Sequence, residues 1–261
     1  MSEQVISSTH SPNILLKIEY DGTDFCGWQR QPDGPTIQST IEDFLQSVLQ
    51  RRVVLYASGR TDSGVHALSQ YAMFRGDVRY EPQVWAKMLN FNLPPSIRIL
   101  ESRLMPDDFH AQKDVLSKTY EYRILNRKVA SAINRGVHFY PGKLDWDKIR
   151  EALVCFIGEK DFKSFQGAKA EVQTTIRTIF RFELLQLAED FYAFQVEGNG
   201  FLKHMVRTMV GTLLEVGEGK FKPSEVSEII ASRDRRRAGR TVPPSGLYLA
   251  KVVYPERYGL N

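Results

Sequence analysis

The sequence has 261 residues, of which 42% are hydrophobic, and it carries a formal net charge of +4. This length and composition suffice for one large packed domain or two small ones and exclude wholesale disorder. The mild positive charge permits a nucleic-acid partner without demonstrating one.

The first part of the chain alternates between strand and helix patterns. Residues 1–12 are polar and show no secretory signal, so we predict a flexible tail there. The elements that we predict after it are a strand at 14–20, a helix at 36–50, strands at 53–56 and 68–75, a helix at 82–91 and a strand at 97–104. The order β-α-β-β-α-β is that of a ferredoxin-like unit.

The second part of the chain shows a similar order with insertions. The predicted elements are a strand at 117–125, a helix that Asp145 caps and Gly158 closes, strands at 175–186 and 191–197, a helix at 202–214, a helix from Ser224 and a strand at 246–254. We therefore predict an α+β fold of two ferredoxin-like halves, residues 13–110 and 111–261. Their mostly antiparallel sheets would join edge to edge into one extended sheet with a central cleft. The duplication rests on element order alone.

One loop draws attention because of its composition. Residues 57–67, ASGRTDSGVHA, join two apolar runs and place Arg60 and Asp62 two residues apart among Gly and Ser. Asp and Gly are also what tight turns use, so an ordinary turn is one interpretation. The other is a loop that presents a carboxylate for chemistry.

Other candidate residues also allow two interpretations each. Tyr120 lies on a predicted strand, where it is either a core aromatic or a ring that stacks on a ligand. Arg207 lies beside the buried stripe of a predicted helix, where it either extends to water or pairs with an acid. The cluster Arg235, Arg236 and Arg237 is either a solvated basic loop or a patch that contacts phosphates.

Several function classes are excluded by missing motifs. Cys26 and Cys155 are far apart and the histidines lack metal-ligand spacing, so we expect no metal site, no disulfide framework and a reducing, cytoplasmic setting. No apolar run approaches the roughly 20 residues of a membrane helix. Glycine-rich nucleotide signatures and a G-x-S-x-G elbow are also missing. Covalent or general-base chemistry by one carboxylate, supported by Arg, remains.

The loop ASGRTDSGVHA resembles the active-site motif of the tRNA pseudouridine synthase A family, in which G-R-T-D-x-G-V-H-A holds the catalytic Asp. Ser63 stands where Ala is frequent in that family, and both residues are small. The likeness covers nearly the whole chain, in family order. The other blocks that carry it are YDGTDFCGWQRQ at 20–31, KTYEYRI at 118–124, GNGFLKHMVRTMVGTLLEVG at 198–217 and GRTVPPSGLYLAKVVYP at 239–255.

The resemblance implies a function and a set of roles. It implies that Asp62 is catalytic with Arg60 beside it, that Tyr120 stacks on the target base and that Arg207 pairs with Asp62. The implied reaction isomerises uridine to pseudouridine at positions 38–40 of the tRNA anticodon stem-loop, in a homodimer and without a cofactor. The chemistry suits these residues, since Arg207 would favour an ionised Asp62 and the flipped base needs a stacking partner. Whether Asp62 attacks the sugar, attacks the base or abstracts a proton stays open.

Three alternatives remain at this point. A non-catalytic RNA-binding module is one, although the aromatic signatures of such modules are absent. A glycosidase would need a second carboxylate near Asp62, for which Asp21 and Asp24 are candidates. A pseudouridine synthase with other target uridines is the third.

Overall fold

The computed structural model describes residues 11–77, 79–134, 136–168 and 172–260. The predicted tail at 1–12 therefore falls almost wholly outside the described residues. The strands and helices in chain order are β1 (Asn13–Tyr20), α1 (Ile37–Leu49), β2 (Tyr56–Ala57), β3 (His66–Arg75), α2 (Val84–Asn92), β4 (Ile97–Met105), β5 (Ser117–Leu125), β6 (His138–Phe139), α3 (Trp146–Leu153), β7 (Gly158–Asp161), β8 (Ile176–Ala188), β9 (Phe191–Gly198), α4 (Met205–Gly217), α5 (Glu225–Ser232) and β10 (Leu247–Val253).

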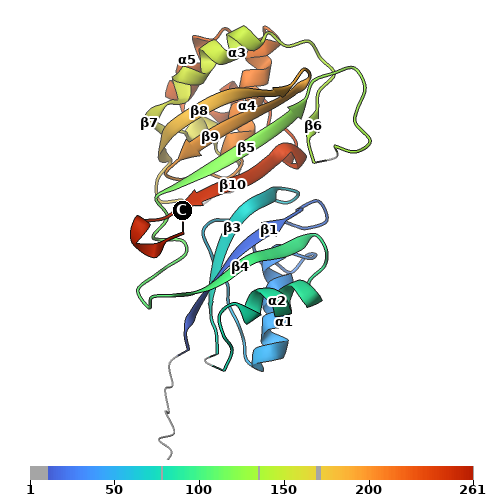
Figure 1. Ribbon diagram of the computed structural model, residues 1–261. Coiled ribbons are helices and arrows are strands. Elements are labelled where there is room, and N and C mark those ends of the chain that lie inside the picture. Colours follow the sequence, from blue (N-terminus) through green and yellow to red (C-terminus); the bar gives the residue numbers. More distant parts are fainter. Residues whose placement is uncertain (1–10, 78, 135, 169–171, 261) are drawn as a thin grey trace, which may run out of the picture.

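All strands of the described residues belong to one large sheet, ordered β4-β1-β3-β10-β5-β9-β8-β7, with β2 on β3 and β6 on β5 (Figure 1). The N-terminal half has the order β4-β1-β3-β2, and the C-terminal half has the corresponding order β10-β5-β9-β8. Pairing within each of these four-strand sets is antiparallel, whereas the short β6 pairs with β5 in parallel. The predicted α+β class is confirmed.

The two halves meet at a short parallel pairing of β10 with β3. It joins Tyr248 to His66 and Leu249 to Ala67. The rings of His66 and Tyr248 stack there with centroids 4.6 Å apart. Buried apolar side chains from both halves form one continuous cluster. The two halves thus share a core as well as a sheet.

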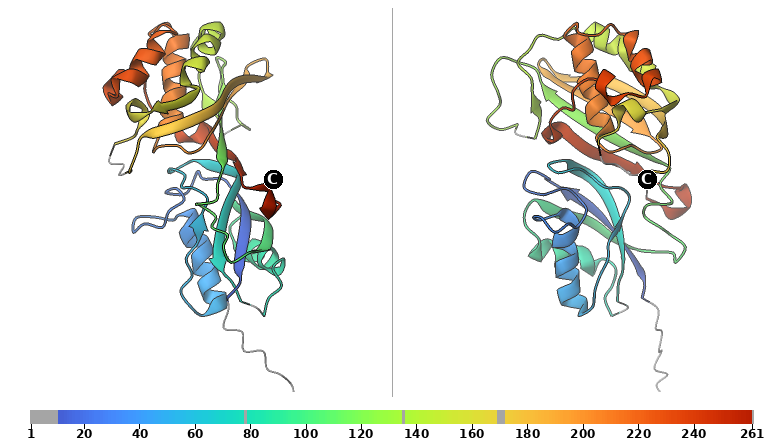
Figure 2. Two further views of the ribbon diagram at one scale, coloured as in Figure 1. Left: turned by 90° about the vertical axis from the view of Figure 1, so that its left-hand side faces the viewer. Right: turned by 180° about the vertical axis from the view of Figure 1, so that it is seen from behind.

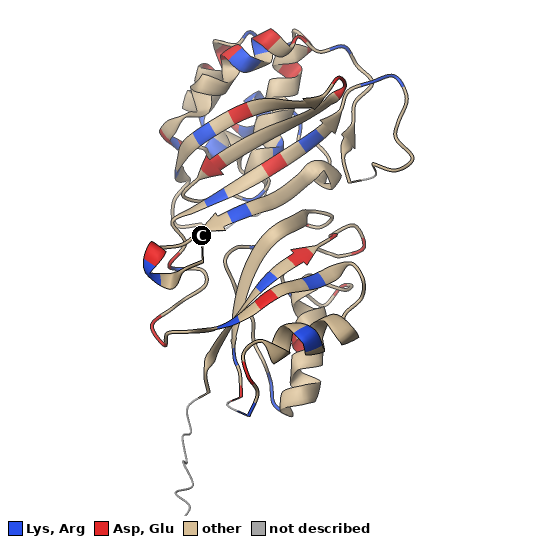
Figure 3. Cartoon of the chain, in the orientation of Figure 1, with Lys and Arg blue, Asp and Glu red and all other residues tan. Residues whose placement is uncertain are grey.

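Helices cover one face of the C-terminal part of the sheet, where α3, α4 and α5 lie together (Figures 1 and 2). Several strands of the sheet carry both basic residues, Lys or Arg, and acidic residues, Asp or Glu (Figure 3). Within the described part of the chain, no helix is both long and apolar enough to cross a membrane.

Local sequence explains where several elements begin. Thr36 caps α1 by accepting a hydrogen bond from the backbone of Ser39, whose hydroxyl accepts one from the backbone of Thr36 in return. Asp145 caps α3, as the sequence predicts, because its carboxylate accepts from the backbone N–H of Lys148. The fold therefore starts these helices at residues whose side chains satisfy free backbone donors.

Some predicted boundaries are wrong. The strand at 53–56 shrinks to the two residues of β2, and β6 and β7 were not predicted. Gly158 has φ +94° and begins β7, because α3 ends earlier and a 3-10 turn at Val154–Phe156 follows it. The helix predicted from residue 202 begins at Met205, because His204 is in the left-handed conformation with φ 61°.

Candidate active site

The loop at 57–67 is held by the segment that follows β1. The backbone N–H of Trp28 donates to the carbonyl of Thr61, 3.1 Å away, and that of Gly64 donates to the carbonyl of Phe25. The hydroxyls of Tyr20 and Thr61 are hydrogen-bonded at 2.7 Å. Thr61 and Gly64, which lie on either side of Asp62 in the loop, are thereby fixed to another segment.

Glycines allow this close approach. A Cβ atom at Gly22 would lie 2.0 Å from the carbonyl oxygen of Val65. Gly27 has φ +90°, and a Cβ atom there would lie 2.7 Å from the carbonyl oxygen of Thr61. Neither position has room for a side chain, which explains why these glycines stand in the 20–31 block.

Asp62 faces two basic side chains from the other half of the chain. Its Oδ2 atom lies 3.6 Å from Nη1 of Arg207 and 3.7 Å from Nε2 of His204. The Asp62 side chain is 26% exposed and that of Arg207 is 13% exposed. Nε of Arg207 donates to the carbonyl of Val242 at 2.8 Å, which fixes the guanidinium beside the carboxylate. A partly buried, paired carboxylate accessible from solvent is suited to covalent or general-base chemistry.

His204 is a site residue that the sequence reasoning missed. It lies three residues before Arg207 in the block at 198–217, a spacing that could have identified it. Burial lowers its pKa and the nearby Arg207 and Lys203 add to this, although Asp62 opposes them. A Cβ atom at Gly167 would lie 2.7 Å from its Nδ1 atom, so its ring packs against backbone.

Tyr120 lies on β5 and is 8% exposed. Its ring packs edge-on against Phe201 with centroids 5.1 Å apart. Burial raises the pKa of Tyr120, and the neighbouring Tyr20 and Asp62 raise it further. The residue thus belongs to the core and also lies within the electrostatic reach of Asp62.

The other candidate arginines differ in exposure and in their hydrogen-bond partners. Arg60 is exposed and has no hydrogen-bond or ion-pair partner within the described ranges. Arg235 donates to the carbonyls of Ala238 and Gly239 and to the hydroxyl of Thr241. It therefore holds its own segment together.

Arg236 and Arg237 lie in the same short 3-10 turn but extend outward. Arg236 pairs with Asp234 at 2.7 Å, and Arg237 lies 3.8 Å from Glu228. Their side chains are 88% and 53% exposed. Exposed pairs of this kind contribute little to stability, so a phosphate can compete for the guanidinium groups.

Asp21, one of the two carboxylates considered for a glycosidase, has partners of its own. Asp21 accepts hydrogen bonds from Thr23 and lies 3.1 Å from Nδ1 of His66. These contacts together lower the pKa of the Asp21 carboxyl, against the opposing effect of its burial. The two ion-pair partners of Asp62 within the described residues are both basic.

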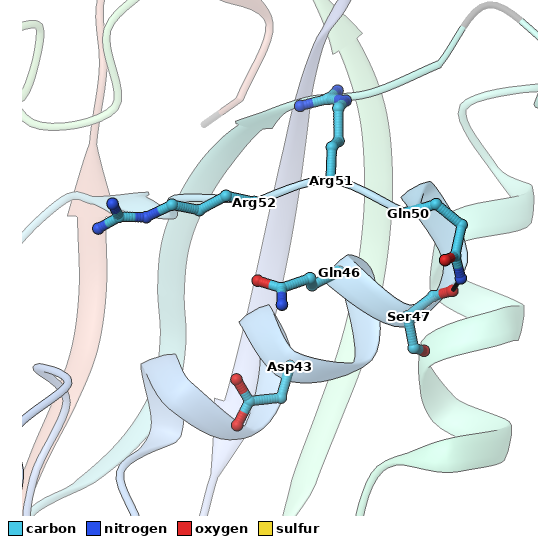
Figure 4. Close-up of a pocket in the computed structure, with 6 residues that line it drawn as sticks. All are labelled: Asp43, Gln46, Ser47, Gln50, Arg51 and Arg52. Atoms are coloured by element: carbon cyan, nitrogen blue, oxygen red, sulfur yellow. Dashed lines mark hydrogen bonds between the residues drawn. The ribbon is translucent and has the colours of Figure 1, made fainter.

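Other features lie away from these residues. A surface hollow at the end of α1 is lined by Asp43, Gln46, Ser47, Gln50, Arg51 and Arg52 (Figure 4). None of the candidate residues lines it. Among the residues that the structure describes, no group of three or more His, Cys, Asp or Glu could hold a metal ion.

Comparison with known proteins identifies the family. Residues 17–112 and 152–255 match the family model described as tRNA pseudouridine synthase. The chain belongs to this family. The predicted family and the predicted enzyme class, an isomerase acting as a tRNA pseudouridine synthase, are confirmed.

Individual relatives extend the likeness over nearly the whole chain. The tRNA pseudouridine synthase A of Caldicellulosiruptor bescii is 45% identical over 243 residues, which cover 93% of this chain and 99% of the relative. That of Geobacter sp. (strain M21) is 42% identical and covers 94% and 99%. A chain in a solved structure of an H/ACA RNP bound to a substrate RNA containing 2'-deoxyuridine is 15% identical with a TM-score of 0.37, covering 77% of this chain and 44% of that one.

Proposed function

We propose that this chain converts uridine to pseudouridine at positions 38–40 of the tRNA anticodon stem-loop, with Asp62 as the catalytic carboxylate. The observation that carries the proposal is the position of Asp62. It lies on a braced loop of one half and faces Arg207 and His204 of the other half. Family membership supports the reaction, and the loop motif supports the choice of Asp62.

The reaction rearranges bonds within one nucleotide. The N1–C1′ bond breaks, the base rotates, a C5–C1′ bond forms and the proton on C5 is lost as N1 gains one. Atoms and electrons balance without an oxidant, a reductant or a cofactor. Asp62 acts on the sugar or the base, and the guanidinium group of Arg207 places a positive charge 3.6 Å from its carboxylate.

The remaining residues bind and shield the nucleotide. The target base must leave its stack to reach Asp62, and the ring of Tyr120 receives it. A base–aromatic stack is worth roughly 1–3 kcal/mol. Arg60, exposed and unpaired within the described residues, contacts the substrate beside Asp62. Arg236 and Arg237 bind tRNA phosphates from outside, and Arg235 keeps their segment in place.

We also infer larger-scale properties that rest on the family resemblance and the fold. Each half is a ferredoxin-like unit, with residues 13–110 and 111–261 as domains and a cleft between them, which the matching strand orders support. The protein works as a homodimer in the cytoplasm. Sedimentation of the full chain at micromolar concentration tests the dimer.

The function is tested with unmodified tRNA transcript and no added cofactor. Wild type should form pseudouridine, and Asp62→Asn should stay folded, bind tRNA and form none, because Asn keeps the shape but not the charge. Asp24→Asn, in the segment after β1, is the matched control and should keep full activity. Free uracil would indicate a glycosidase, unchanged RNA a binding module, and pseudouridine elsewhere another target position.

A further inference from the structure

Two cations lie on strands β5 and β8, which β9 separates, and one of them, Lys118, lies against the Asp62 loop. Lys118 is on β5, two residues before Tyr120, and therefore on the same face of the sheet. Arg177 is on β8. Between them runs β9, where Gly198 pairs in register with Lys118 on one side and with Ile179 on the other. Gly198 has no side chain, and Ile179 and Phe201 occupy the place that its Cβ atom would take.

Further glycines border both cations. A Cβ atom at Gly59 would lie 2.7 Å from Nζ of Lys118, so the ammonium group lies against the backbone of the Asp62 loop. A Cβ atom at Gly200 would lie 3.6 Å from Nε of Arg177. A side chain at Gly59 would displace the Lys118 ammonium group, whereas one at Gly200 would make an ordinary contact with Arg177.

Neither cation has a carboxylate partner within the described ranges. Arg177 donates from Nη1 to the carbonyls of Thr174 and Ile176, which leaves Nε and Nη2 without partners there. Burial, together with the charge of Arg177, lowers the pKa of Lys118 to about 8. In contrast, Arg236 pairs with Asp234. Two uncompensated positive charges at one place are unfavourable for the free protein, and an anion would relieve them.

We propose that Lys118 and Arg177 form a binding site for a phosphate group of the RNA backbone, next to the nucleotide on which Asp62 acts. Arg177 offers planar N–H donors that match phosphate oxygens, and Lys118 adds a compact positive charge. The choice of RNA as the source of the phosphate rests on the proposed function. Free inorganic phosphate shares the same chemistry and is distinguished by experiment.

The test measures tRNA affinity against salt concentration for Lys118→Met and Arg177→Met. Each variant should lower the slope of log K against log salt by about one, because one phosphate contact is lost. KM for tRNA should rise about tenfold or more, with kcat within about threefold of wild type. The matched control is Lys251→Met. Lys251 pairs in register with Thr119, so its side chain lies on the opposite face from Lys118, and its slope should not change.

Additional variants and a second probe keep the outcomes distinct. Lys118→Arg retains the charge and should keep the wild-type slope, which separates loss of charge from misfolding. Unchanged slopes in folded Lys118→Met and Arg177→Met would overturn the proposal. If inorganic phosphate protects Lys118 from acylation while those slopes are unchanged, the site takes free phosphate and not RNA. If the slopes fall but wild type forms no pseudouridine, the phosphate site stands and the proposed function fails.

Discussion

Arg207 connects two parts of the molecule through one guanidinium group: Nε donates to the carbonyl of Val242 at 2.8 Å, and Nη1 lies 3.6 Å from Oδ2 of Asp62. The segment containing Val242 leads into β10, which joins the two halves. The charge opposite Asp62 is therefore positioned by the same segment that completes the sheet.

We expect Arg207→Lys to lower kcat by about 10- to 100-fold, because a single ammonium group cannot satisfy Val242 and Asp62 together. Affinity for tRNA should stay within about threefold, since Arg207 is mostly buried. Single-turnover kinetics on tRNA transcript measure the rate at which bound uridine is converted to pseudouridine. Arg181→Lys, at an exposed arginine of β8, is the control and should behave as wild type. Equal kcat in Arg207→Lys and wild type would show that the double contact is unimportant.

Tyr120→Phe and Tyr120→Ala separate the core role of the ring from its role at the base. The hydroxyl of Tyr120 has no hydrogen-bond partner within the described residues. The free energy of unfolding of the Phe variant should therefore lie within about 1 kcal/mol of the wild-type value, and the variant should bind tRNA normally. The Ala variant should lose about 3–5 kcal/mol of unfolding free energy and all turnover. Thermal melts and tRNA binding measure both. Turnover lost in the Phe variant would assign proton transfer to the phenol oxygen.

The Arg-rich segment should divide into two kinds of residue. Replacing Arg236 and Arg237 together by Ala should lower the salt slope of tRNA binding by about one to two, with unchanged stability. Arg235→Ala should instead lower the free energy of unfolding by about 1–2 kcal/mol, because three acceptors lose their donor. Salt titrations and chemical denaturation measure the two effects. A slope unchanged in the double variant would leave Arg236 and Arg237 as solvated residues.

Lys118→Met should stabilise the fold while weakening tRNA binding. The pKa of Lys118 falls from its usual 10.5 to about 8 on folding, so the protonated amine is favoured in the unfolded chain. Below about pH 8 the free energy of unfolding of the variant should exceed that of wild type by about 1–3 kcal/mol. This difference should shrink between pH 8 and 10.5 and vanish above pH 10.5, because the Lys118 amine of the wild type is then neutral in both the folded and the unfolded chain. Denaturation across this pH range measures it, and a constant difference would contradict the assigned cause.

Periodicity in the sequence predicts most of the elements, because amphipathic helices and alternating strands bury one face each. It does not predict β7, whose sequence GEKD has no apolar alternation and is defined by its pairing with β8. The late start of α4 depends on His204, whose left-handed conformation is uncommon for residues other than glycine. Long-range placement, such as β10 between β3 and β5, is set by tertiary packing.

In the candidate site, too, the sequence predicts some residues and tertiary packing determines others. The loop motif identifies Asp62, the resemblance assigns Arg207 to it, and the three-residue spacing from Arg207 is the sequence signal for His204. Lys118 reads as an ordinary charged residue of a strand, since its burial depends on the backbone at Gly59. Contacts between segments distant in sequence thus account for what the residue pattern leaves out.

The place of β10 in the sheet has a consequence for the chain as it is made on the ribosome. Strands β1, β3 and β4, with the Asp62 loop, emerge early and can pair with each other before the rest exists. β10 is the last strand described to emerge, and it alone hydrogen-bonds to both β3 and β5. A nascent protein interrupted before residue 247 lacks the strand that pairs with β5 on one side and with β3 on the other, so the half with Arg207 is not joined to the half with Asp62 through the sheet. We therefore expect a prematurely released fragment to be prone to aggregation and to have no activity.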